Sequence, residues 1–451
     1  MGKSKIEFTK FYLPNGLKCI LYRRPELHSV HISVQVNVGS LDENEKNNGL
    51  SHLLEHLPFN GTRDLPSWSE VDRFNNNIAG SGNAYTSISH TKYYGIFPSQ
   101  YIEQAIYYYS QLVLHPLLKD EEITKEKDII LDEMKRDEDT VESKIYDNIR
   151  LNRFEDNNTS YSYKVIGSKD TVSKFTRKEL LQHYDNYYVP ENMEIYIVGN
   201  FNEELTKRLL NKYFCNDVKD KDYAHKPERK FIKEYPEYSK FKIHAVQKGD
   251  LDQYYLTITF PGFGKLNKTI EDRLAVPFLE RTLASPQYQH SVLWRRLREE
   301  LGLVYGVNAY QYDLYQRSMF IVETSFNPEY LETILKEIYD GINKIKQNKV
   351  TDEIFKTRQK RLLDIQLMTL DNPENVLNWI EEQEEEMEYH GKYLTIEEYI
   401  NIIKNYKFED VINTSTQILD WNNVNIGIVS SHKPQDVVKE AEKVWNRIVK
   451  K

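Results

Sequence analysis

A short stretch of this chain occurs twice, and the repetition restricts the fold more than any other feature. Residues 192–198 read NMEIYIV and residues 423–429 read NVNIGIV, and a segment with helical spacing of apolar residues follows each copy. Both copies are rich in the branched side chains that favour a buried strand. A related strand followed by a helix in both halves predicts two copies of one fold.

The remaining sequence supports a division into two domains. In both halves strand-like apolar segments stand between amphipathic helical segments, and this mixture predicts the α+β class. A chain of 451 residues is long enough to bury more than one core. A polar stretch with few apolar side chains separates the halves. We therefore expect a first domain over residues 1–220, a linker over 221–240 and a second domain over 241–451.

One His-x-x-Glu-His cluster, made of His52, Glu55 and His56, is a candidate metal-binding and catalytic site. On a helix, positions i and i+4 share a face, so the two imidazoles can bind one metal ion. Glu55 lies on the same face, where its carboxylate can accept a proton from a metal-bound water. Taken alone, the pattern also fits a surface helix that carries two ordinary histidines.

A catalytic metal site of this kind needs a third protein ligand. The two cysteines, Cys19 and Cys215, lie far apart in the sequence, which argues against a cysteine-rich site. A carboxylate is the natural candidate. Glu126 and Glu133 are two helical turns apart and share one face of a predicted helix. Many other acidic residues crowd this segment, however, so the local sequence alone favours a solvated acidic helix.

The run of residues 48–62, NGLSHLLEHLPFNGT, resembles the signature of the pitrilysin family of zinc peptidases, the inverzincins. The spacing from His56 to Glu133 matches the third zinc ligand of that family, and Glu126 matches its supporting carboxylate. Residues 82–86, GNAYT, resemble its substrate-binding edge strand. In the second half, Arg298 and Tyr305 resemble a pair of the family's functional residues.

The resemblance implies a half-clamshell of two tandem homologous domains, each a mostly antiparallel sheet covered by helices. The first domain would be catalytic and would bind one zinc ion through His52, His56 and Glu133. The second domain would lack a zinc site, and its Arg298 and Tyr305 would contact the substrate backbone or the developing oxyanion.

The implied activity is that of a zinc-dependent endopeptidase acting on peptides or unfolded segments inside a closed chamber. Glu55 would activate a zinc-bound water, and Glu126 would orient Glu133 or a zinc-linked histidine. The peptide would add a β-strand to the edge that contains Asn83 and Ala84.

A chamber built from two half-shells implies a dimer. Because one chain carries both the zinc residues and the Arg298 and Tyr305 pair, we expect a homodimer, or else a heterodimer with a related subunit. The alternative function is a non-catalytic or partner-dependent subunit of a heterodimeric peptidase complex. The presence of every expected zinc and base residue disfavours it.

Pro58 departs from the family pattern, which more often has an aliphatic residue at this position. Proline lacks a backbone N–H and crowds the carbonyl four residues before it. We expect Pro58 to end or kink the metal-binding helix just after His56, which keeps the ligands usable and leaves the extent of any tilt open.

Charge and hydropathy exclude other classes of function. The 60 basic and 69 acidic residues are well mixed and give a net charge of -9, with no basic surface for nucleic acid. The acidic run at residues 381–388 is predicted to be a solvated helix face. No segment approaches 18 consecutive apolar residues, so we expect no membrane span. The beginning of the chain resembles neither a signal nor a transit peptide, and we expect a cytoplasmic protein.

Overall fold

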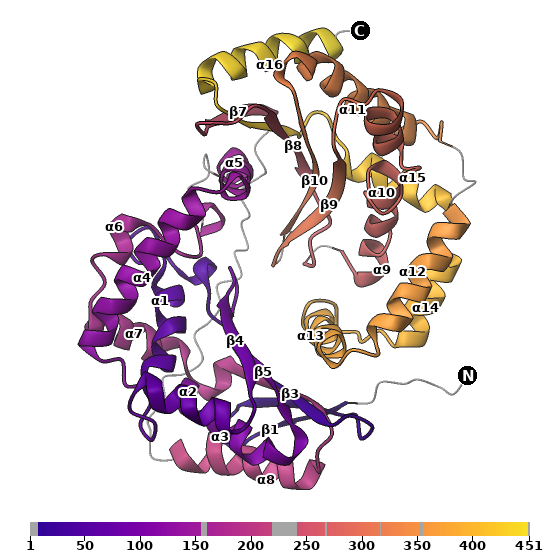
Figure 1. Ribbon diagram of the computed structural model, residues 1–451. Coiled ribbons are helices and arrows are strands. Elements are labelled where there is room, and N and C mark those ends of the chain that lie inside the picture. Colours follow the sequence, from indigo (N-terminus) through magenta and orange to yellow (C-terminus); the bar gives the residue numbers. More distant parts are fainter. Residues whose placement is uncertain are drawn as a thin grey trace. The chain divides into compact units, whose positions relative to one another are not determined.

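The computed structural model describes residues 8–154, 160–218, 241–266, 268–315, 317–350 and 355–449. Two β-sheets organise these residues, and each sheet is the centre of one compact unit (Figure 1). The predicted linker, residues 221–240, lies outside the described residues.

The first sheet has six strands in the order β1-β2-β6-β3-β5-β4. Their bounds are β1 (Thr9–Tyr12), β2 (Lys18–Arg23), β3 (Ser29–Val36), β4 (Ser81–Thr86), β5 (Thr91–Pro98) and β6 (Met193–Gly199). Only the β2–β6 pair is parallel. Alternate branched side chains of β3 point to one face of the sheet and pack with the helices of the unit in a core. β4 is an edge strand of the sheet.

The second sheet repeats this arrangement in the order β7-β11-β8-β10-β9. Its strands are β7 (Lys242–Gln247), β8 (Tyr254–Pro261), β9 (Val307–Leu314), β10 (Arg317–Phe326) and β11 (Asn425–Ser430). The β7–β11 pair, which corresponds to β2–β6, is parallel, and the other pairs are antiparallel. The repeated segments, now β6 and β11, occupy the same place in the two sheets. The predicted α+β class with two copies of a mostly antiparallel sheet is therefore confirmed.

Helices cover the first sheet and form its core with it. They are α1 (Leu50–His56), α2 (Trp68–Asn77), α3 (Ile102–Leu114), α4 (Asp120–Glu138), α6 (Lys169–Val172), α7 (Arg177–Tyr187) and α8 (Glu203–Phe214). α7 begins at a capping box in which the side chains of Thr176 and Glu179 satisfy free backbone N–H groups.

The helices of the second unit follow the same principle. They are α5 (Val141–Phe154), α9 (Ile270–Arg273), α10 (Val276–Leu283), α11 (Leu331–Lys346), α12 (Phe355–Thr369), α14 (Ile396–Asn405), α15 (Phe408–Ile418) and α16 (Pro434–Val449). A further helix, α13 (Pro373–His390), is divided between the units, with its residues up to Glu382 in the first unit and the rest in the second. In α11 the buried residues recur every three or four positions, which gives the apolar stripe that packs on the second core.

Each unit includes helical residues from the other half of the chain. Among the described residues, the first unit comprises 8–136, 163–218 and 369–382. The second comprises 137–154, 160–162, 241–266, 268–315, 317–350, 355–368 and 383–449. α5 packs on β7 and β11 of the second sheet, where the buried Arg153 donates to Thr259 and Asn423. The first part of α13 packs three apolar side chains on β2 and β6 of the first sheet.

The acidic run at residues 381–388 is not a solvated helix face, so that prediction is wrong. Within the second unit, Glu386 is only 3% exposed, bonds the Arg273 guanidinium at 2.7 Å and accepts the Ile270 N–H. Burial of a carboxylate is tolerated only when hydrogen-bond donors or a cation pair with it. Helical sequence periodicity does not report such partners.

None of the described helices is long and apolar enough to cross a membrane.

Candidate metal centre

The α1 helix begins at a buried acidic cap. The Glu43 carboxylate accepts the backbone N–H groups of Gly49 at 2.8 Å and Ser51 at 2.7 Å. These N–H groups have no partner within the helix, and a negative charge at a helix start also suits the helix dipole. Gly49 has a φ of +97°, and a Cβ there would meet Gly167 Cα at 2.8 Å, so only glycine fits. Glu43 and Gly49 thus fix where α1 starts.

The helix ends where the sequence predicted. α1 stops at His56, and a 3-10 turn, η2 (Leu57–Asn60), continues with Pro58 near its start. Pro58 therefore changes the winding of the chain just past the second histidine and leaves the turn that carries both imidazoles intact.

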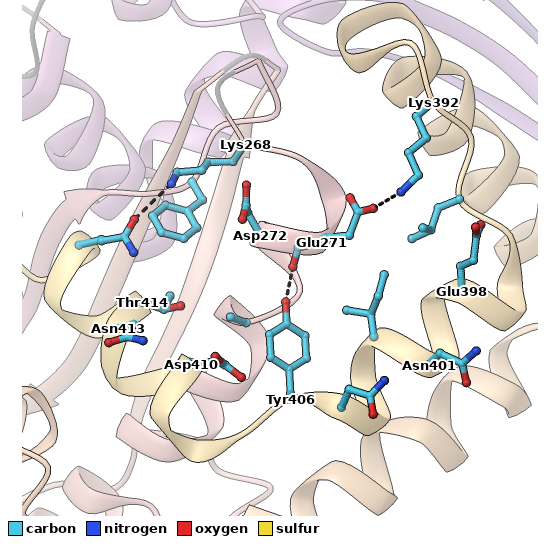
Figure 2. A pocket seen from close by; sticks show the side chains of 16 residues that line it. Lys268, Glu271, Asp272, Lys392, Glu398, Asn401, Tyr406, Asp410, Asn413 and Thr414 are labelled. Atoms are coloured by element: carbon cyan, nitrogen blue, oxygen red, sulfur yellow. Dashed lines mark hydrogen bonds and ion pairs between the residues drawn. The ribbon is translucent and has the colours of Figure 1, made fainter.

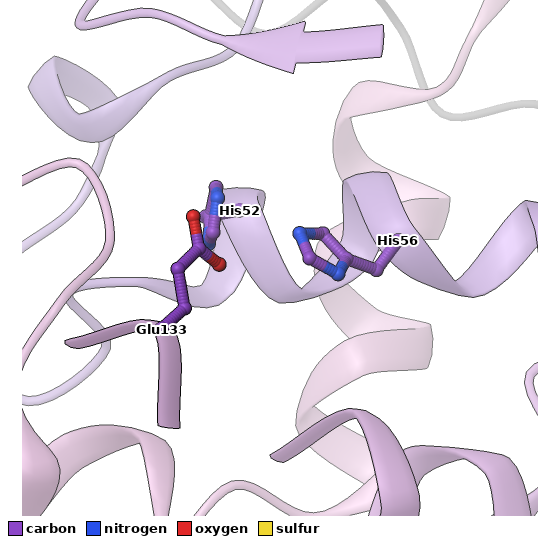
Figure 3. A group of neighbouring side chains, drawn as sticks. All are labelled: His52, His56 and Glu133. Carbon is purple, nitrogen blue, oxygen red and sulfur yellow. The ribbon is translucent and has the colours of Figure 1, made fainter. Parts of the chain in front are cut away.

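The structure brings His52, His56 and Glu133 together. One ligand atom from each side chain lies within 4.8 Å of the others. The two histidines project from successive turns of α1, and Figure 3 shows the Glu133 carboxylate beside the His52 ring. Within the part of the chain that the structure describes, no other group of three or more His, Cys, Asp or Glu side chains is suited to hold a metal ion.

Glu126 supports a histidine and not Glu133. Its carboxylate bonds His56 Nδ1 at 3.0 Å through one oxygen and accepts Asn60 Nδ2 at 2.7 Å through the other. A bond at Nδ1 leaves the Nε2 lone pair of His56 for a metal and fixes the ring orientation. The sequence left open whether Glu126 contacts Glu133 or a histidine, and the observed contact is with a histidine.

The electrostatics of the cluster suit a cation. Burial, reinforced by the charge of His56, lowers the pKa of His52 to about 3, so this imidazole is neutral and one of its ring nitrogens has an available lone pair. Burial also lowers the pKa of His56, but the bond from Glu126 and the nearby carboxylates raise it by more. For Glu126, the bonds from His56 and Asn60 outweigh burial and hold the carboxyl pKa below its usual range. Two imidazoles and a carboxylate are a ligand set that zinc accepts.

Glu55 lies on the same helix, only 7% exposed. Burial raises its carboxyl pKa, and a hydrogen bond from Thr86 Oγ1 at 2.7 Å partly offsets this effect. A partly desolvated carboxylate next to the metal ligands is suited to exchange protons.

The predicted substrate residues lie on β4, the edge strand of the first sheet. The outward N–H of Ala84 is covered by the Asn83 side chain, whose Oδ1 accepts it at 2.9 Å. Beside this edge is a pocket of about 240 Å³ whose wall combines aromatic and polar side chains. It is lined by Phe59, Trp68, Val71, Asp72, Asn75, Gly82, Asn83, Tyr94, Tyr108 and Tyr109.

Arg298 and Tyr305 lie next to each other in the second unit. The Arg298 guanidinium donates to the Tyr305 carbonyl and sits 4.9 Å from the centre of its ring. Arg298 belongs to a π-helical turn, η8 (Trp294–Glu300), and Tyr305 is 85% exposed. An exposed aromatic ring held by a cation is available for contact with a ligand. The substrate role of the pair remains a prediction.

Three residues of the site were not predicted from the sequence: Glu43, Asn60 and Thr86. Asn60 and Thr86 belong to the two motif segments, but a motif does not report which backbone or carboxylate a side chain contacts. Glu43 precedes the motif in a stretch with several polar residues, so the sequence contains no signal that distinguishes it.

A second pocket, of about 640 Å³, lies in the second unit (Figure 2). Its charged groups are partly paired, since Lys392 bonds Glu271 at 2.5 Å and Lys268 donates to Gln417 at 3.2 Å. Neither imidazole nor thiol groups line it. The convergence of metal-binding side chains therefore identifies the first unit as the candidate centre.

Two family models and several known proteins match this chain. The model of "Insulinase (Peptidase family M16)" matches residues 18–164, and that of "Peptidase M16 inactive domain" matches residues 174–362. An uncharacterized zinc protease of Rickettsia felis is 28% identical over 416 residues, 92% of this chain and 95% of the relative. An uncharacterized zinc protease of Bacillus subtilis, YmxG, is 24% identical over 91% of this chain and 95% of its own length. The fold matches a protease from Helicobacter pylori with a TM-score of 0.82, at 19% identity over 94% and 100% of the two chains.

Proposed function

The chain belongs to the insulinase family of peptidases, family M16, and from this membership we propose that it is a zinc-dependent endopeptidase. The convergence of His52, His56 and Glu133 around one point is the observation that supports the proposal. All three lie in the segment that matches the insulinase model, residues 18–164, and the proton-transfer group Glu55 is on the same helix as the two histidines.

In this proposal His52, His56 and Glu133 hold the metal. Bound zinc supplies a Lewis acid that polarises the scissile carbonyl and makes water more acidic. Glu55 accepts the proton of the attacking water and returns it to the leaving amine. Glu126 keeps the His56 ring in the orientation that presents Nε2.

The substrate is a peptide or an unfolded segment that pairs with β4. An edge strand offers one row of free backbone groups, so main-chain bonding provides affinity with little demand on sequence. The Asn83 side chain, which covers the Ala84 N–H, gives way to a peptide carbonyl. The pocket next to β4 then receives a side chain of the peptide, which its aromatic and polar residues contact.

We keep two sequence-based expectations as part of the proposal. Arg298 and Tyr305 contact the substrate, so Arg298→Ala is expected to raise KM in a peptide-cleavage assay.

The chain forms a homodimer, or a heterodimer with a related subunit, and its mass in solution by light scattering tests this directly.

Glu126→Gln is expected to weaken zinc binding by about 10- to 100-fold, the usual effect of losing a group that orients a metal-bound histidine. Glutamine is the same size but cannot provide a charged acceptor for His56 Nδ1. Zinc affinity is measured by competition with a chelator of known strength. Glu122→Gln, on the same helix α4, is the control and should leave the affinity unchanged.

The central experiment combines zinc content and cleavage on the purified wild-type chain. We expect one zinc per chain and cleavage of unfolded fluorogenic peptides that stops when a chelator removes the metal. A chain that holds zinc and leaves every peptide intact would favour the alternative, a non-catalytic or partner-dependent subunit. Restoration of cleavage by a related subunit would then identify the partner-dependent form.

A further inference from the structure

Thr86 is the last residue of β4, the strand to which the substrate is proposed to add. Its hydroxyl donates to Glu55 Oε2 at 2.7 Å. This is the contact between the edge strand and the carboxylate that is proposed to move protons. A short bond to an ionised acceptor is stronger than one between neutral groups.

The groups around Thr86 determine which acceptor its hydroxyl proton is donated to. The other nearby hydroxyl, Thr91 Oγ1, lies 3.3 Å from Thr86 Oγ1 and is fully buried. Thr91 gives its single proton to the Val38 carbonyl at 3.0 Å, so it acts only as an acceptor toward Thr86. Between a neutral acceptor at 3.3 Å and a carboxylate at 2.7 Å, the carboxylate is the better partner.

The orientation of the Glu55 carboxylate therefore depends on Thr86. Oε2 accepts the hydroxyl proton, and the carboxylate also interacts with the backbone N–H of Thr86. The hydroxyl is therefore one of two groups of Thr86 that hold the side chain in one rotation about its last bond. The terminal torsion of a glutamate is otherwise broad and is ordered only by such contacts. The same hydroxyl belongs to β4, the strand that is proposed to bind the peptide. The position of the Glu55 carboxylate is therefore fixed relative to the strand that holds the substrate.

We propose that Thr86 is a positioning residue, whose hydroxyl holds Glu55 Oε2 and leaves Oε1 to take up and return the proton. The proposal rests on the peptidase function proposed above. Thr86 reaches the reaction only through Glu55. Its removal therefore affects the chemical step and not the binding of peptide or metal.

The test is a pair of substitutions. Thr86→Val has the same shape without the hydroxyl, and Thr86→Ser keeps the hydroxyl. We expect Thr86→Val to lower kcat by roughly 10- to 100-fold, the range for losing a hydrogen bond to a charged group, with KM within about twofold of wild type. Thr86→Ser should stay within about threefold of wild-type kcat. Zinc content should be one per chain in both.

Thr206→Val controls for the structural cost of losing a buried threonine hydroxyl. Thr206 is fully buried in α8 and donates to the Asn202 carbonyl at 2.8 Å, away from Glu55 in the same unit. We expect Thr206→Val to lower the melting temperature at least as much as Thr86→Val does, while kcat stays at the wild-type level. A similar fall in kcat for Thr206→Val would mean that lost stability explains the effect, which would overturn the positioning role.

Crystal structures of the two Thr86 variants give a measurement that does not depend on turnover. The Glu55 carboxylate should rotate away from its wild-type position in Thr86→Val and keep it in Thr86→Ser. An unchanged carboxylate in Thr86→Val, or wild-type kcat in that variant, would overturn the positioning role while an active wild type leaves the peptidase proposal standing. An inactive wild type that binds zinc would refute the peptidase proposal, and the positioning role with it.

Discussion

Glu55→Gln is expected to remove peptide hydrolysis while the chain keeps its zinc. Glutamine has the shape of glutamate, and its amide oxygen can still accept the Thr86 hydroxyl. It has no basic oxygen to take a proton, and a positioned general base typically contributes about 10²- to 10⁴-fold to the rate. Because Glu55 is not one of the three converging ligands, the metal should remain at one per chain. Cleavage of a fluorogenic unfolded peptide and metal analysis of the same sample measure both effects.

Glu45→Gln is the matched control for this experiment. Glu45 is exposed and precedes α1, so the same change of charge there should leave both cleavage and zinc content at wild-type levels. If Glu55→Gln cleaved the peptide as fast as wild type, another group would have to move the proton and the proposed mechanism would be incorrect. Loss of zinc from Glu55→Gln would instead mean that Glu55 helps to hold the metal.

The proximity of the two histidines could be predicted from the sequence because its geometry is local. His52 and His56 are one helical turn apart, and any helix that includes both places them on one face. Glu133 was different, because local sequence favoured a solvated acidic helix and only the family resemblance selected this carboxylate. The choice between the two predicted partners of Glu126 depended on how α4 packs against α1, which sequence spacing does not contain.

The fold was also predicted in part. The repeat at residues 192–198 and 423–429 gave the two equivalent strands β6 and β11. The sequence did not predict that α5 would pack on the second sheet or that α13 would begin on the first. An amphipathic pattern shows that a helix has an apolar face, but it does not identify the surface that covers this face. The burial of Glu386 had the same cause, because its partner Arg273 is distant in sequence.

Removal of a metal ligand should have a second large effect, on zinc binding itself. His52→Ala and Glu133→Gln each take one of three donors from the centre, and we expect either chain to be purified without stoichiometric zinc and without cleavage activity. Stability gives an independent measurement. A ligand that binds only the folded chain stabilises it by about 4 kcal/mol when present at about 1,000 times its Kd. Added zinc should therefore raise the melting temperature of the metal-free wild type but not that of either variant.

The contrast with a histidine outside the cluster makes this prediction specific. His28 is exposed, precedes β3 and does not belong to the converging group, so His28→Asn should keep zinc, cleavage and the zinc-dependent rise in melting temperature. If Glu133→Gln also kept all three, the third ligand would have to be another carboxylate, and Glu126 is already engaged with His56 and Asn60. Since no other cluster of suitable side chains occurs among the described residues, that result would overturn the assignment of Glu133 as a metal ligand and leave the position of the metal unexplained by this structure.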